Sequence, residues 1–262
     1  MIAEALAGRR IAVTGATGFL GTALVERLLR SVPECEVLPL VRPGRRAGAA
    51  ERVRRDILRN DAFDRLRREW GDHFDAEIAR RVTPLGGDVS MAGLGLSPED
   101  REHLAGVDVV IHSAAAVSFD SPIDAAVAVN LLGPSRVAQA LRHCRATGSA
   151  AHLVAVSTAY VAGNRRGEAP EALLSDTLFS TDVDWRAEVA GADRARADAD
   201  AESRRPEMLR KFTKAARAEL GAAGTPLLAA RAERMREQWV DDRLVELGRA
   251  RAAALGWPDA YA

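Results

Sequence analysis

The most constraining feature of this sequence is a glycine-patterned turn near the N-terminus that joins an apolar run to a helical pattern. Ile11, Ala12 and Val13 predict a buried strand, and glycines follow at positions 15, 18 and 21. Apolar residues then recur at helical spacing, at Phe19, Leu20, Ala23, Leu24, Leu28 and Leu29. A strand, a tight glycine turn and a helix in direct succession are typical of the dinucleotide-binding turn of parallel α/β sheets.

Each glycine of this turn has an expected role. Gly15 permits the tight turn, Gly18 lets the backbone approach a pyrophosphate, and Gly21 lets the helix pack close to the strand. The phosphates would meet the unpaired N–H groups of the helix start, so we expect Thr17, Phe19 and Leu20 to line the site as well. An ordinary glycine-rich turn in an α/β protein is the alternative interpretation.

Composition limits the other classes of function. The chain has 262 residues, 47% apolar and 28% charged, with a formal net charge of zero, so nothing indicates nucleic acid as a bulk partner. No apolar run reaches the roughly 20 residues of a membrane span, and the N-terminus lacks the pattern of a signal peptide. Cys35 and Cys144 lie far apart in the sequence and are interpreted as reduced thiols, which favours a cytoplasmic location and no metal site.

The second predicted strand, residues 36–42, indicates which dinucleotide binds. NAD-selective sites carry an acidic residue at the end of this strand, but here the strand ends in Arg42, with Arg45 and Arg46 just beyond. A guanidinium binds the extra 2′-phosphate of NADP, so the sequence favours NADP. Three solvated arginines in an Arg-rich chain are the alternative.

The next stretch predicts two amphipathic helices over residues 49–81 and a third strand over residues 82–89. That strand ends in Gly87, Asp88 and Val89, where the chain would pass the adenine. Asp88 accepts a hydrogen bond from the adenine amino group in one interpretation and shapes a turn in the other. Ser97 is expected to cap a following helix that has Pro98 at its first position.

The fourth strand, residues 107–112, runs into the small residues Ser113, Ala114 and Ala115, which leave room for a flat ring where a cofactor crosses the sheet. His112 is interpreted as a structural residue rather than a general base. The fifth strand, residues 152–156, is expected to be central in the sheet. It ends in two adjacent hydroxyls, Ser157 and Thr158, at the edge where ligands bind.

The other regions are predicted to be helical. A long helix is expected over residues 123–144, in which Asn130 bonds to a neighbouring loop or a water. Residues 165–256 predict a helical insertion with breaks near Pro206 and Pro226 and a partly mobile stretch over residues 192–205. Its many charges indicate a solvated surface, with a docking face for a partner as the alternative.

Several of these motifs occur in the order of an extended short-chain dehydrogenase/reductase. Within that superfamily the sequence resembles the fatty acyl-CoA reductases and thioester reductases, which carry a male-sterility-type NAD-binding domain. Three stretches carry the resemblance: residues 14–21, residues 110–119 and residues 156–163. The resemblance covers residues 9–164 and resumes at residues 256–261. It implies three regions: an NADP-binding Rossmann domain over residues 1–164, a helical insertion over residues 165–256, and the start of a catalytic helix over residues 257–262.

The resemblance also implies roles for hydroxyl groups. In the family a Ser or Thr after the fifth strand holds the substrate carbonyl, which corresponds to Thr158, or alternatively Ser157. A Tyr four residues before a Lys delivers the proton, which corresponds to Tyr261. The sequence ends at Ala262, so that Lys and a sixth strand are absent from it. We therefore expect the front part of a reductase, which binds nucleotide more readily than it turns over.

These features lead to one main hypothesis and two alternatives. The main hypothesis is NADPH-dependent reduction of a fatty acyl thioester, carried by CoA or an acyl carrier, to an aldehyde or alcohol. An extended-type dehydrogenase or epimerase acting on a nucleotide sugar or small alcohol is the second reading. The third is a non-catalytic module that binds NADP or a partner. Without the resemblance, the residues indicate only an α/β oxidoreductase that binds NADP. They do not indicate an oligomeric state.

Overall fold

The computed structural model describes residues 2–44, 47–145, 151–164, 166–177, 183–221 and 226–261. The chain divides into two compact units. Met1–Ala115 together with Ala128–Ser157 form one, here called the sheet unit, and Ala116–Val127 together with Thr158–Ala262 form the other, the helical unit. Each unit has its own core, and each is described by itself.

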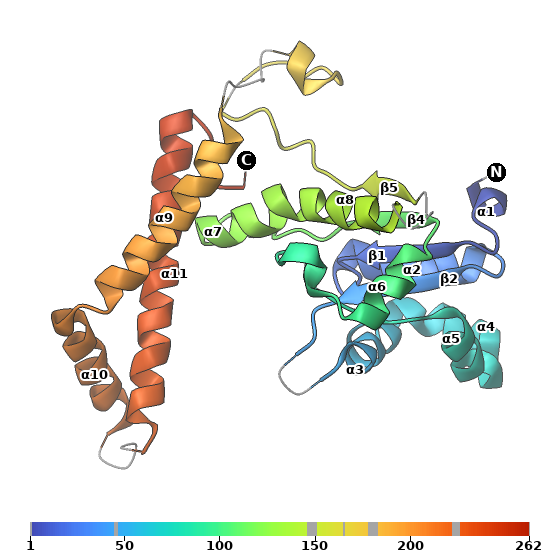
Figure 1. Cartoon of the computed structure of the whole chain (residues 1–262), viewed down its shortest axis with the longest axis horizontal. Coiled ribbons are helices and arrows are strands. Elements are labelled where there is room, and N and C mark those ends of the chain that lie inside the picture. Colours follow the sequence, from blue (N-terminus) through green and yellow to red (C-terminus); the bar gives the residue numbers. More distant parts are fainter. Residues whose placement is uncertain are drawn as a thin grey trace. The chain divides into compact units, whose positions relative to one another are not determined.

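The sheet unit is built on five parallel strands in the order β3-β2-β1-β4-β5. Their bounds are β1 (Arg10–Thr14), β2 (Glu36–Val41), β3 (Leu85–Gly86), β4 (Val109–His112) and β5 (His152–Ala155). Figure 1 shows the helices of this unit arranged around the sheet. The predicted doubly wound, Rossmann-like sheet is confirmed. The third strand is shorter than predicted, and β5 lies at the edge of the described sheet rather than in its centre.

Apolar residues of the strands alternate between two cores, one on each face of the sheet. Ile11 and Val13 of β1 pack in a cluster with α2 (Phe19–Ser31), whereas Ala12 between them belongs to the opposite cluster. Successive side chains of a strand point to opposite faces, so helices must cover both sides. The second cluster also contains Leu104 and Val137, which come from α6 (Pro98–Ala105) and α8 (Leu132–Arg145). Ser97 caps α6 as predicted, with its hydroxyl accepting the Asp100 N–H.

The segment between β2 and β3 is more broken than the two helices predicted for it. It contains α3 (Ala49–Arg52), η1 (Val53–Leu58), η2 (Asp61–Phe63), α4 (Asp64–Trp70), η3 (Gly71–His73) and α5 (Phe74–Arg81). Asn60 starts a new turn by accepting the Ala62 N–H at 2.9 Å, and Gly71 interrupts the helix with a φ of +50°. Two further short helices complete the unit, α1 (Ile2–Ala5) and η4 (Ala92–Gly95).

The buried face of helix α2 overlaps only in part with the predicted one. Val25, Leu28 and Leu29 face the core, whereas Phe19 is 98% exposed and Ala23 also lies on the outer side. Buried Arg81 closes the far end of this helix. Its guanidinium donates to the carbonyls of three residues at or beyond the last turn of α2, namely Leu29, Val32 and Cys35, at 2.8–2.9 Å. A cation at a helix C-terminus is favourable because it meets unpaired carbonyls.

The predicted long helix over residues 123–144 is divided by a wide turn. The chain passes through α7 (Ile123–Ala126), the π-helical η5 (Val127–Leu131) and α8. Pro134 explains the wide turn, because its nitrogen has no proton and its ring clashes with the carbonyl four residues earlier, that of Asn130. Asn130 therefore lies inside the π-helical turn.

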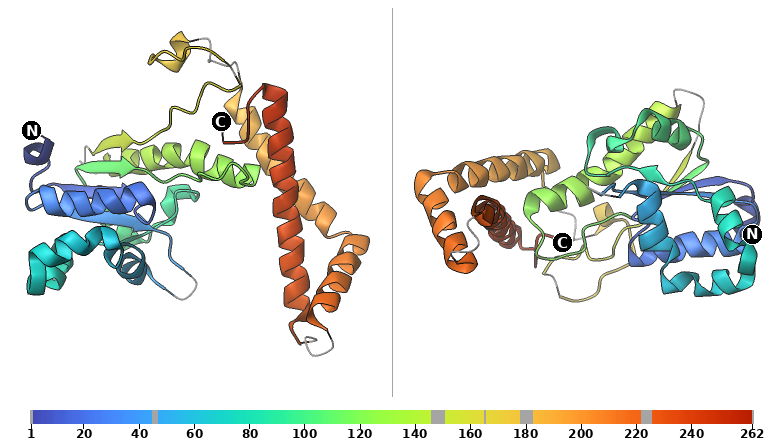
Figure 2. Two further views of the ribbon diagram at one scale, coloured as in Figure 1. Left: turned by 180° about the vertical axis from the view of Figure 1, so that it is seen from behind. Right: turned by 90° about the horizontal axis from the view of Figure 1, so that it is seen from below.

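The helical unit contains α7, η6 (Leu174–Asp176), α9 (Trp185–Ser203), α10 (Pro206–Leu220) and α11 (Leu228–Leu255). Helices α10 and α11 run side by side (Figure 2), and α9 packs on α11 around Ala199, Val240 and Leu244. The expected break near Pro206 is present. The stretch over residues 192–205, expected to be partly mobile, instead forms the second half and the end of α9, with Ala192 and Ala199 buried.

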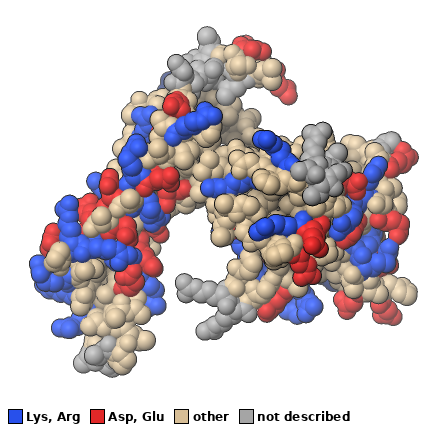
Figure 3. All heavy atoms as spheres, in the orientation of Figure 1, with Lys and Arg blue, Asp and Glu red and all other residues tan. Residues whose placement is uncertain are grey.

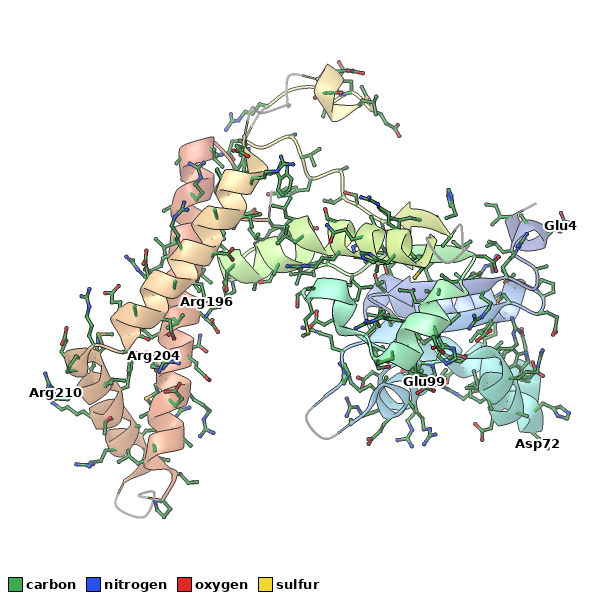
Figure 4. All side chains as sticks on the ribbon, viewed as in Figure 1. Glu4, Asp72, Glu99, Arg196, Arg204 and Arg210 are labelled. Carbon is green, nitrogen blue, oxygen red and sulfur yellow. The ribbon has the colours of Figure 1, made fainter. Side chains whose placement is uncertain are left out.

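Charged residues of the helical unit are paired with one another. Arg196 of α9 contacts Asp124 of α7 at 2.6 Å and Asp241 of α11 at 3.1 Å. Arg236 is almost fully buried and binds Asp200 and Glu233. Positive and negative groups are interspersed over these helices (Figure 3). Figure 4 labels Arg196 on α9, Arg204 at the C-terminal end of α9 and Arg210 on α10.

Candidate functional site

The glycine turn joins the carboxyl end of β1 to α2. The Gly18 N–H donates to the Gly15 carbonyl at 2.9 Å, and Gly15 has a φ of +69°, which closes the turn. The Thr22 hydroxyl on the first turns of α2 donates to the Ala16 carbonyl at 3.0 Å. The turn is therefore fixed from both of its ends.

Close backbone contacts explain why glycine stands at two of these positions. A Cβ at Gly15 would lie 2.7 Å from the backbone of Ser113 and Ala114, at the end of β4. A Cβ at Gly21 would lie 2.1 Å from the Gly15 carbonyl oxygen. The turn is thus pressed between β4 on one side and α2 on the other, and the structure supplies the cradle that a pyrophosphate requires.

The start of α2 is suited to an anion. Gly18 is the N-cap residue and makes no side-chain cap, so no side chain competes for the first-turn N–H groups. Thr17, Phe19 and Leu20 surround this point and are all exposed. The backbone N–H groups and the positive end of the helix dipole fit the diphosphate of a dinucleotide.

A buried network ties β1 to β4 directly beneath this turn. The Thr14 hydroxyl lies 2.7 Å from Nδ1 of His112 and accepts the Ala114 N–H at 3.3 Å. The Ser113 hydroxyl donates to the Thr14 carbonyl at 2.8 Å. His112 is 2% exposed, and burial lowers the pKa of its imidazole. The structural interpretation of His112 is therefore the one that its geometry favours.

The Ser113 hydroxyl is thus used within the protein, whereas Ala115 is exposed beyond it. Thr14 links these residues to the glycine turn. Sequence reasoning assigned no role to Thr14, although its position directly before Gly15 was the available signal.

The residues predicted to contact the adenosine lie after β2 and β3, which are neighbours in the sheet. Arg42 follows β2, and its side chain is exposed while its carbonyl accepts a hydrogen bond from Arg52. Arg45 and Arg46 lie outside the described residues. Asp88 accepts both the N–H and the hydroxyl of Ser90 on one carboxylate oxygen, so it shapes the turn, and the adenine contact stays a prediction. Val89 is buried in the core.

The hydroxyl pair predicted to meet the substrate follows β5. Ser157 and Thr158 are both exposed, and Thr158 Oγ1 accepts the Tyr160 N–H at 3.1 Å. Since this hydroxyl oxygen is the acceptor there, its own proton is available for donation to another group.

Tyr261 lies in a cluster of three aromatic rings in the helical unit. Its ring centroid is 5.6 Å from that of Phe119 and 6.0 Å from that of Tyr160, and Phe119 and Tyr160 are 5.9 Å apart. Asp259 joins two of them by accepting the Tyr261 N–H at 2.8 Å and the Tyr160 hydroxyl at 3.0 Å. This hydrogen bond to a carboxylate raises the pKa of Tyr160.

The structure therefore brings the regions of Thr158 and Tyr261 together through Tyr160. Residues 259–261 form a turn in which Asp259 accepts the N–H two residues on, as an N-cap residue does, and the start of a helix at residues 257–262 stays a prediction. Sequence reasoning gave no role to Phe119, Tyr160 or Asp259. Their signal was their aromatic or acidic character within the family-like stretches.

In the described part of the chain, no helix is both long and apolar enough to cross a lipid bilayer. Among the same residues, His, Cys, Asp and Glu side chains nowhere form a group of three that would hold a metal ion.

Comparison with known proteins gives the family. A family model of NAD-binding domains, described as "Male sterility protein", matches residues 13–261. Fatty acyl-CoA reductase 8 of Arabidopsis thaliana is 35% identical over 170 residues, which are 63% of this chain and 34% of that protein. The chloroplastic fatty acyl-CoA reductase 2 of the same plant is 30% identical over 168 residues, 63% of this chain and 27% of that protein.

Among solved structures, the terminal R domain from the myxalamid PKS-NRPS biosynthetic pathway is similar, with a TM-score of 0.49 and 27% identity over 72% of this chain and 44% of that one. The chain spans about a third of the length of the two plant reductases. The family match extends over nearly the whole chain, from the second half of β1 to Tyr261. The chain therefore belongs to the NAD-binding male sterility protein family.

Proposed function

We propose that this chain carries the cofactor-binding part and the substrate-facing hydroxyls of an NADPH-dependent reductase that acts on fatty acyl thioesters. The observation that carries the proposal is the contact of residues 158–164 with residues 256–261, in which the Tyr160 hydroxyl bonds to Asp259 and the Tyr160 ring lies beside that of Tyr261. The family match and the names of the plant relatives support the same reaction.

The cofactor would be held by backbone groups and one cation. The N–H groups at the start of α2 bind the diphosphate, and Gly15 and Gly21 allow that approach. The guanidinium of Arg42 binds the 2′-phosphate, which distinguishes NADP from NAD. The small residues after β4 leave space for the nicotinamide. When bound, NADPH supplies the hydride of the reduction.

The substrate oxygen would be stabilised by two hydroxyls. Negative charge builds on this oxygen as the carbonyl is reduced, so a positioned donor lowers the barrier. Thr158 donates its hydroxyl proton to the oxygen, because its oxygen already accepts the Tyr160 N–H. Tyr261 delivers a proton to the same oxygen as the general acid. Ser157 is the alternative to Thr158.

The substrate is a thioester of CoA or of an acyl carrier in this proposal, and the expected location is the cytoplasm. The location is supported by the low cysteine content, since the chain has only Cys35 and Cys144 and they lie far apart in the sequence. Organisation into a cofactor region over residues 1–164, a helical insertion over residues 165–256 and a catalytic segment from residue 257 belongs to the same proposal.

The test is the loss of NADPH absorbance with a long-chain acyl-CoA, compared with nucleotide sugars and small alcohols. If the reading frame continues past Ala262, the longer product is assayed beside the chain itself. We expect consumption with the acyl-CoA alone, and a fall of about 100-fold or more in Thr158→Ala and Tyr261→Phe with NADPH binding retained. Consumption with a nucleotide sugar, or tight NADPH binding with no turnover of any thioester, would overturn the proposal in favour of a sugar-acting enzyme or a binding module.

A further inference from the structure

We infer that Asp259 is a positioning residue. Its carboxylate holds the turn of Tyr261 against the segment after β5, and it binds the hydroxyl of Tyr160, which then serves to anchor the two segments together. The inference rests on the proposed function, because it concerns how Tyr261 is presented to a substrate. Asp259, Tyr160 and Tyr261 all belong to the helical unit.

The two oxygens of Asp259 serve two different segments of the chain. Oδ1 accepts the backbone N–H of Tyr261 at 2.8 Å, and this bond shapes the turn that carries the phenol. Oδ2 accepts the hydroxyl proton of Tyr160 at 3.0 Å, from a residue 99 positions earlier. A single carboxylate therefore fixes the backbone of one tyrosine and the hydroxyl of the other.

Neighbouring contacts hold the same two segments together. The Asn164 N–H donates to the Gly256 carbonyl at 3.4 Å, and the Trp257 ring packs at Gly163. Trp257 in turn donates its N–H to Ala252, in the last turns of α11. The segment over residues 256–261 is therefore attached both to residues 163–164 and to the end of α11. Among these attachments, Asp259 forms the hydrogen bonds to the two tyrosines.

The two phenols differ in consequence. Tyr160 donates to a carboxylate, so its ionisation would place two negative charges side by side, and the bond raises the pKa of Tyr160. Asp259 is the charged group that acts on this phenol. The Tyr261 hydroxyl has no hydrogen-bond partner among the described residues. Tyr160 is thus held as a neutral anchor, and Tyr261 is the phenol left to serve a substrate.

The experiment exploits the fact that the chain has only two tyrosines. The chain is labelled with fluorotyrosine, and the two fluorine signals are followed through an alkaline pH titration without substrate or cofactor. Asp259→Asn preserves the shape of the side chain but removes its charge and one acceptor oxygen. Tyr160→Phe removes only the hydroxyl. Asp242→Asn, whose carboxylate bonds to Gln238 on the surface of α11, is the matched control.

The signal lost in Tyr160→Phe is that of Tyr160, and we expect its titration midpoint to be raised in the wild-type chain. In Asp259→Asn this midpoint falls toward that of free fluorotyrosine, and the Tyr261 signal changes position because its turn is loosened. Asp242→Asn changes neither signal. Should Asp259→Asn not fold, Tyr160→Phe decides, because it releases Oδ2 of Asp259 and must shift the Tyr261 signal through the turn that Oδ1 holds.

The inference is overturned if Asp259→Asn leaves the Tyr160 midpoint unchanged, or if it leaves the Tyr261 signal in place. Turnover is a second measurement, and we expect Asp259→Asn to lower kcat and to leave the Kd for NADPH unchanged. The titration needs no activity, so a failure of the reductase proposal and a failure of this inference are distinguishable.

Discussion

Substituting Gly21 by alanine is the sharpest test of the phosphate turn. The added Cβ would lie 2.1 Å from the Gly15 carbonyl oxygen and 2.7 Å from Cα of Ala16. Carbon and oxygen need about 3.5 Å between them, so the helix and the turn must part by more than about 1 Å. Both obstacles are backbone atoms, and no side-chain rotation can relieve the clash.

The structure allows the size of the effect to be worked out. Overpacking in a closed site costs about 1 to 3 kcal/mol, and the backbone on both sides puts this case at the upper end. For a chain of this size a loss of about 3 kcal/mol lowers the unfolding midpoint by roughly 6 to 12 °C. Displacing the first-turn N–H groups also forfeits at least one bond to a charged phosphate, about 1.5 to 3 kcal/mol, or tenfold or more in the Kd for NADPH.

The assay pairs thermal unfolding with titration of NADPH by fluorescence. Gly191→Ala is the matched control, because that glycine lies within α9 and an added Cβ meets only a flexible arginine tip at 3.9 Å. It should leave NADPH binding unchanged and raise stability by about 0.5 to 1 kcal/mol. Wild-type affinity and midpoint in Gly21→Ala would refute the close approach of helix and turn on which the site depends.

Three further predictions concern the sheet unit. Arg42→Ala should weaken NADPH binding by about tenfold or more and leave NADH binding unchanged, as measured by parallel titrations, and equal losses for both would contradict the assignment of the 2′-phosphate. Arg81→Met should lower the free energy of unfolding by about 3 kcal/mol in a denaturant titration, since three carbonyls lose their donor, whereas a loss below about 1 kcal/mol would mean that water replaces it. His112 has a lowered pKa in the folded state, so only the unfolded chain takes up a proton as the pH falls below about 6.5, and stability falls with it by at most about 1.4 kcal/mol per pH unit. His112→Asn should lose this part of the acid destabilisation, and an unchanged pH profile of stability would show that the buried imidazole is protonated in the folded protein.

The sequence predicts well those features that a short pattern determines. The strand over Ile11–Val13, the glycine turn and the helix start behind it depend on residues within a dozen positions, and each was predicted. The cap at Ser97 and the break at Pro206 are of the same kind. Local conformational preference and hydrophobic period are sufficient for such elements.

Features that depend on packing partners were missed. Phe19 fits the helical period of α2 but is exposed, because the face that meets the sheet is set by Val25 and Leu28. Arg81 reads as one more surface charge, although it is buried against the end of α2. The wide turn at Asn130 was not predicted even though Pro134 stands in the sequence four residues later.

At the candidate site, the resemblance to a family pointed to Thr158 and Tyr261, whose roles stay predictions. What joins their segments is a bond between Tyr160 and Asp259, which are 99 positions apart. No local pattern can predict a contact between residues so distant in the chain.

The most direct test of the proposed reaction traces the hydride. The protein is incubated with a long-chain acyl-CoA and NADPH that carries deuterium at the reactive carbon of its nicotinamide, and the product is examined by mass spectrometry. We predict a fatty aldehyde or alcohol with deuterium on the former thioester carbon, and none from Tyr261→Phe in the same time. A bound but unconsumed cofactor, or a product without deuterium at that carbon, would contradict the assignment of this chain to NADPH-dependent thioester reduction.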